Sequence, residues 1–111
     1  MPKDDYFVIA YRLLKYLYDC LKKSKQPNPE VLDADFFTID SFYWEYIIKN
    51  LYLDEYITGV ILVPILGKHT VCVKITVDVQ ITPKGIQYLN ENSMFQTIRG
   101  VVKDVAEIIP I

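Results

Sequence analysis

Apolar and polar residues alternate strictly from Val71 to Ile81, where every odd position is apolar. A period of two is typical of a β-strand with one buried and one solvent-exposed face. The alternation stops at Thr82, whose hydroxyl can cap a helix, and Pro83 suits a first helical position because its missing N–H would be unpaired there. The pattern therefore predicts a strand over residues 71–81 that runs directly into a helix over residues 83–91.

The segments before this strand predict three helices. Residues 5–24 carry apolar side chains at i, i+3 and i+4 spacing, which indicates an amphipathic helix. A short helix over residues 30–36 follows a linker with two prolines, since proline disfavours helix in the residue before it. Asp40 or Ser41 can cap the third helix, over residues 41–53, which is apolar nearly all round.

A second strand and a last helix complete the expected elements. Residues 57–65 are rich in β-branched residues and predict a strand that pairs with residues 71–81 through a hairpin. Ser93 and Gln96 have the form of a capping box, which predicts a separate helix over residues 95–108. This order predicts an α+β winged-helix fold, that is, a helix-turn-helix with a β-hairpin wing, plus a C-terminal helix.

The length of 111 residues indicates a single domain, residues 1–111, with a winged-helix core over residues 5–92 and the C-terminal helix over residues 93–109. The predicted core is made of the apolar positions that repeat with a helical or strand period. They are Leu13, Leu17, Leu21, Ile47, Leu51, Ile57, Val73, Ile75, Val77, Val79, Ile86, Leu89, Phe95 and Ile98.

Three short motifs carry a family resemblance: Tyr56-Ile57-Thr58-Gly59 after the third helix, Ile81-Thr82-Pro83-Lys84-Gly85 after the hairpin, and Tyr88-Leu89 in the next helix. Together with the element order they resemble the YjcQ family of small winged-helix proteins from Firmicutes and their phages. A Thr-x-Lys-Gly turn is also common at the end of the wing in regulators of the PadR and MarR types. The chain departs from the family pattern at Glu55, where the loop usually has a glycine. The resemblance implies a phage or prophage association and transfers no catalytic residue.

Residues that carry enzyme chemistry are sparse. His69 is the only histidine and falls at the predicted, solvated hairpin tip. Cys20 on a helix face and Cys72 on the strand are expected to be inert packing or surface residues. The four glycines form no phosphate-binding loop, and the carboxylate pairs lack the partners of a metal site. We therefore expect a protein that is not an enzyme, with no cofactor, no metal and no small-molecule substrate.

The same residues indicate a location. The N-terminus is too acidic for a signal peptide, and the longest apolar runs fall far below the ~20 residues that span a bilayer. Two cysteines far apart in the sequence are most simply reduced thiols. We expect a cytoplasmic protein without a membrane partner.

Charge weighs against nucleic acid. Across residues 30–55 seven acidic residues stand against one basic residue, Lys49, in the region that would face a DNA duplex. Phosphate contacts need cations, and such a surface repels the phosphate backbone. The wing adds Lys68 and His69 as candidate contacts with a partner. A module that acts by protein–protein interaction is the preferred hypothesis, and a DNA-binding transcriptional regulator is the alternative.

Two surfaces are candidates for that interaction. Tyr43, Trp44, Tyr46 and Tyr52 cannot all point into one core from one helix, and exposed Tyr and Trp suit a partner-binding patch. The alternative is that the short helix and the N-terminal helix cover these rings. A second apolar face recurs at 3-4-3-4 spacing in the C-terminal helix and either docks on the N-terminal helix or forms a homodimer, which we favour. Its residues are Phe95, Ile98, Val102, Val105 and Ile109.

Overall fold

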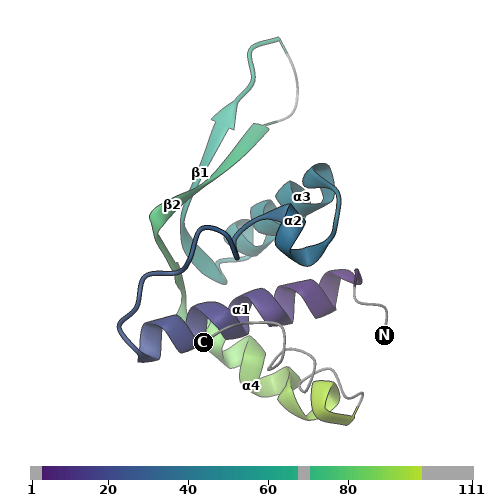
Figure 1. Cartoon of the computed structure of the whole chain (residues 1–111), viewed down its shortest axis with the longest axis vertical. Coiled ribbons are helices and arrows are strands. Elements are labelled where there is room, and N and C mark those ends of the chain that lie inside the picture. The colour runs from purple at the N-terminus through teal and green to yellow at the C-terminus, as the bar shows by residue number, and fades with distance from the viewer. Residues whose placement is uncertain (1–3, 68–70, 99–111) are drawn as a thin grey trace.

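The computed structural model describes residues 4–67 and 71–98, which form an α+β winged helix (Figure 1). Helix α1 lies between α2 and α3 on one side and α4 on the other, and the β1–β2 hairpin projects away from the helices as the wing (Figure 1). The elements are α1 (Tyr6–Lys22), α2 (Ala34–Phe37), α3 (Ser41–Leu53), β1 (Ile57–Pro64), β2 (Val71–Ile81) and α4 (Pro83–Ile98). The predicted fold class is confirmed, and α3 and β2 have the bounds that the sequence predicts.

Helix α1 is the centre of the core because α3, α4 and β2 all pack against it. Its side chains Leu13 and Leu17 are fully buried, as predicted. Arg12 and Asp19, which the amphipathic pattern places off the apolar face, are buried as well. Asp19 forms an ion pair with Lys15, whose Nζ donates to its carboxylate at 2.8 Å. The predicted core position Leu21 is exposed, because it lies in the last turn of α1 at the edge of the core.

Side chains cap the starts of α1, α3 and α4, and a residue in the left-handed conformation follows the ends of α1, α2 and α3. Asp40 accepts a hydrogen bond from the Phe42 N–H at 2.9 Å and so caps α3. After α1, α2 and α3 the chain takes a positive φ at Ser24, Thr38 and Glu55, and the next N–H bonds back into the last helical turn. This is the Schellman arrangement, in which glycine usually takes the left-handed position. Glu55 has φ +67°, which explains why a family pattern would place glycine there.

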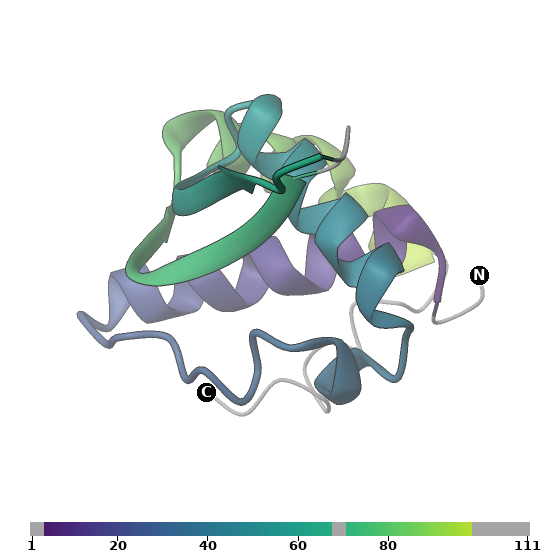
Figure 2. The same cartoon turned by 90° about the horizontal axis from the view of Figure 1, so that it is seen from above.

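The linker between α1 and α2 is held against α1 rather than forming the early helix that the sequence predicts. The Asn28 N–H donates to the Tyr16 hydroxyl at 2.7 Å, and the Asn28 side chain accepts from the Glu30 N–H. Residues 29–33 form turns, and α2 begins only at Ala34. Figure 2 shows this linker running beside α1.

The hairpin contains an irregularity that alters the predicted alternation. Thr58 pairs with Gln80, but Val60 pairs with Ile75, so four residues of β2 bulge opposite Gly59. Before the bulge Val73 and Ile75 pack against the core, and Val79, the last residue of the bulge, and Ile81 beyond it are buried. Val77 lies within the bulge and is 72% exposed, so its assignment to the core is wrong.

The last described helix is continuous where the sequence predicts two. Helix α4 runs from Pro83 through Ser93 to Ile98, so Ser93 does not cap a new helix. No proline or glycine interrupts residues 86–98, and a started helix propagates readily through such residues. The side chains of Phe95 and Ile98, and the positions Val102, Val105 and Ile109, lie outside the described part, and with them the predicted C-terminal face.

Candidate functional site

The three motifs of the family resemblance meet at one junction of the fold. The Thr82 hydroxyl donates to the Glu55 carbonyl at 2.6 Å and accepts from the Gly85 N–H at 3.1 Å, so Thr82 caps α4 as predicted. The Tyr56 and Tyr88 rings lie 5.2 Å apart. A Cβ at Gly85 would come within 2.5 Å of the Tyr56 carbonyl. The motifs therefore join the end of α3 to the start of α4.

The outward side of α3 carries a row of large apolar side chains. Phe42 is 72% exposed, Tyr46 50% and Leu53 57%, at positions i, i+4 and i+11 of one helix. This spacing places them on one face. From the start of α1, Tyr6 joins Tyr46 with 6.2 Å between ring centroids, and the exposed Phe7 packs edge-on against Tyr6 at 5.3 Å. We call these five residues, Tyr6, Phe7, Phe42, Tyr46 and Leu53, the aromatic face.

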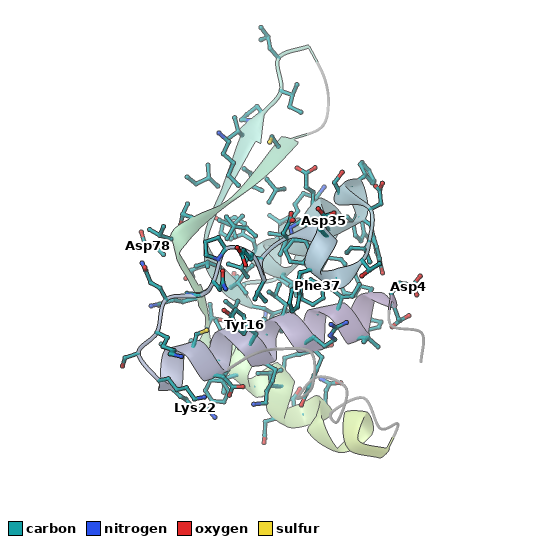
Figure 3. All side chains as sticks on the ribbon, in the orientation of Figure 1. Asp4, Tyr16, Lys22, Asp35, Phe37 and Asp78 are labelled. Atoms are coloured by element: carbon teal, nitrogen blue, oxygen red, sulfur yellow. The ribbon has the colours of Figure 1, made fainter. Side chains whose placement is uncertain are left out.

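Of the four rings that the sequence assigns to a partner-binding patch, only Tyr46 is exposed. Trp44 is 6% exposed and stacks on Phe37 of α2 with 5.3 Å between ring centroids. Its place in an exposed patch is therefore wrong, because α2 covers it. Figure 3 shows Phe37 between α2 and α1. Tyr43 and Tyr52 are half-buried, and the Tyr43 hydroxyl donates to the Asp4 carbonyl at 2.7 Å. The candidate wing contacts Lys68 and His69 lie outside the described residues.

Sequence reasoning did not assign Tyr6, Phe7, Phe42 or Leu53 to a binding surface. The signal for two of them was present, since Phe42, Tyr46, Lys49 and Leu53 repeat with a helical period. It was obscured because α3 is apolar on every side, and nothing in that pattern says which side other elements cover. For Phe7 the sequence offers only its position beside the predicted apolar face of α1.

Beside the aromatic face, four phenol rings gather from different elements: Tyr6, Tyr46, Tyr56 and Tyr88. Burial raises the pKa of Tyr6 to about 12, with further contributions from Asp54 and the three neighbouring phenols. Burial also raises the pKa of Tyr88, helped by Tyr56 and Asp5. A phenol in such surroundings stays neutral at pH 7 and offers an uncharged ring and a hydroxyl.

This perturbation predicts a loss of stability at alkaline pH. The folded-state pKa of Tyr6 lies near 12 against 10.0 for a free tyrosine, so the folded protein holds the proton more tightly than the unfolded chain. Its contribution is complete below about pH 10 and falls as the pH rises from about 10 to about 12. We expect Tyr6→Phe to reduce the drop in urea midpoint between pH 8 and pH 11. An unchanged drop would contradict this assignment.

Several acidic residues within residues 30–55 have structural roles. Asp40 caps α3, and Glu45 accepts a hydrogen bond from the Val73 N–H at 3.2 Å, which holds the edge of β2 to α3. Asp54 is the C-cap of α3. The carboxylates of Asp40 and Glu45 therefore help to hold the winged-helix framework together.

Several hollows are lined by the described residues. A hollow of about 550 Å³ beside the aromatic face is lined by residues that include Leu53, Glu55 and Lys84. Another, of about 370 Å³, lies between the end of α1 and the bulge of β2. No group of three or more His, Cys, Asp or Glu side chains within residues 4–67 and 71–98 could hold a metal ion. None of the described helices is long and apolar enough to cross a bilayer.

A helix-turn-helix core followed by a β-hairpin defines the winged-helix class. Within it, the family model described as YjcQ protein matches residues 11–108, and the chain belongs to the YjcQ family. Searches among curated proteins and among solved structures find no match.

Proposed function

We propose that this protein is a non-enzymatic winged-helix module that acts by binding another protein through the aromatic face. One observation carries the proposal: the outward side of α3 presents Phe42, Tyr46 and Leu53. In winged-helix proteins that read DNA, the corresponding helix presents polar and basic side chains to the major groove. Exposed aromatic side chains grouped on one face are instead typical of protein interfaces.

The alternative is a DNA-binding regulator, which the fold class favours. Lys49 on α3 and Lys74 on β2 are the cations that α3 and the described part of the wing offer to a phosphate backbone. Few phosphate contacts mean weak binding, because each neutralised phosphate contributes through counterion release. The proposal of a protein-binding module also includes the homodimer and the phage association that the family resemblance implies.

The test places a photo-crosslinking amino acid at position 42, and in a matched control at position 77. Phe42 and Val77 are equally exposed but lie on α3 and β2, so exposure alone does not distinguish them. In extracts of the source cells we expect a discrete protein adduct from position 42 that disappears in Tyr46→Ser, and none from position 77. Equal labelling from both positions would contradict the proposal.

A DNA titration tests the alternative directly. Labelled duplex fragments from the protein's own locus are titrated at about 150 mM salt, near physiological ionic strength. We expect no specific shift. A sub-micromolar shift that survives competitor DNA, and that Lys49→Glu with Lys68→Glu abolishes, would establish the regulator instead.

A further inference from the structure

The border of the aromatic face is acidic. Asp4 and Asp5 lie at the start of α1, and Asp54 follows the last residue of α3. Burial is the largest cause that raises the pKa of Tyr43, and the charges of Asp5 and Asp4 come next. For Tyr6, the charge of Asp54 comes next after burial. These carboxylates therefore lie close enough to the phenol groups to influence them electrostatically. Among residues 4–67 and 71–98, the cations on this side are Lys49 in α3 and Lys84, whose Nζ lies 5.5 Å from the centre of the Tyr56 ring.

The basic cluster of the chain lies at the other end of α1. Lys22 is in the last turn of α1, and Lys23 and Lys25 follow it. Figure 3 places Asp4 and Lys22 at opposite ends of this helix. A helix of 17 residues is about 25 Å long, roughly three screening lengths at physiological salt. The lysines therefore do not neutralise the acidic border, and the face favours a cationic partner.

Aromatic rings within reach of carboxylates are suited to a guanidinium group. Cations stack on the faces of tyrosine rings, as Lys22 does on Tyr18 at 4.5 Å and Lys84 on Tyr56. Arginine adds a planar group that stacks and that pairs with carboxylates through two parallel hydrogen bonds. The hollow of about 550 Å³ beside Leu53 has both Glu55 and Lys84 in its lining. Its apolar part, which includes Ile57 and Pro83, suits the aliphatic stem of an arginine.

We infer that the aromatic face binds an arginine-bearing segment of a partner protein, with the guanidinium group against the tyrosine rings and Asp54. The inference rests on the proposed function, since it states the chemistry of the partner that this face takes. The C-terminal end of α3 strengthens it, because the helix dipole places partial negative charge beside Asp54.

The experiment selects ligands from a display library of random 12-residue peptides. The full chain is the bait. Peptides that also bind the double variant Phe42→Ser, Tyr46→Ser are removed by counter-selection, and Val77→Ser is the control variant. We expect selected peptides to contain arginine at least three times as often as the library. The best peptide should bind at least tenfold more weakly to Asp54→Asn and after replacement of its arginine by citrulline, and unchanged to Val77→Ser. Circular dichroism checks that each variant is folded.

The outcomes separate the inference from the proposed function. Peptides that need Phe42 and Tyr46 but are acidic or uncharged would overturn the arginine-bearing partner and leave the protein-interaction surface in place. If the counter-selection removes every peptide that binds the wild type, or if nothing is enriched at all, both would be overturned. Arginine-rich peptides whose binding is insensitive to Asp54→Asn and to citrulline would not be held through the guanidinium group and would also overturn the inference.

Discussion

Gly59→Ala is expected to lower the free energy of unfolding by about 3–5 kcal/mol, near the upper end for single substitutions. Gly59 has φ +79°, which costs a residue with a side chain roughly 1–2 kcal/mol. A Cβ there would also lie 2.5 Å from backbone atoms of Asp78 and Val79. Real Cβ atoms essentially never approach backbone so closely, so the bulge of β2 must move away and release Val79 from the core.

Gly67→Ala is the matched control for this substitution. Gly67 has a similar φ of +76°, but a Cβ there meets nothing within 4 Å. It therefore carries the conformational cost without the clash, and we expect a loss of only about 1–2 kcal/mol. Urea denaturation of both variants measures the difference. Equal losses would mean that β2 relaxes freely around Gly59 and that the bulge does not hold the wing in place.

Gly59 also explains where the sequence was informative and where it was not. The alternation of residues 71–81 predicted both ends of β2 and the burial of Val79, since these depend on the residues' own pattern. It failed at Val77, because a period of two assumes an uninterrupted ladder. The ladder is broken by a glycine 18 positions away, where the Thr76 hydroxyl donates to the Gly59 carbonyl at 2.8 Å. The pattern of residues 71–81 alone does not indicate that contact.

The helices show the same division between local and distant causes. Caps such as Asp40 and Thr82 act on neighbouring residues; the sequence predicted Thr82 and gave Asp40 as one of two candidates, with Ser41. The burial of Arg12 depends on an aromatic residue of another helix, because its guanidinium lies 4.8 Å from the centre of the Phe37 ring. The composition of the aromatic face depends on which side of α3 the other elements cover, and the pattern of α3 leaves that open.

Trp44→Ala and Phe42→Ala test this assignment of the two sides of α3. Trp44 is 6% exposed and stacked on Phe37, so its removal leaves a cavity and leaves the Phe37 ring without its stacking partner. We expect Trp44→Ala to cost about 3–5 kcal/mol, the usual range for a buried tryptophan. Phe42, two positions earlier, is 72% exposed, and its replacement is expected to change stability by less than about 0.5 kcal/mol.

Two measurements separate the two roles. Thermal denaturation followed by circular dichroism gives the stability of both variants. Since Trp44 is the only tryptophan, its fluorescence reports on the core in wild type and in Phe42→Ala. We expect the emission maximum to be the same in these two proteins and typical of a buried indole. A Phe42→Ala chain as unstable as Trp44→Ala, or one with red-shifted emission, would mean that Phe42 belongs to the core. The outward side of α3 would then no longer present Phe42, its most exposed ring. Protein binding would have to be assigned to another surface.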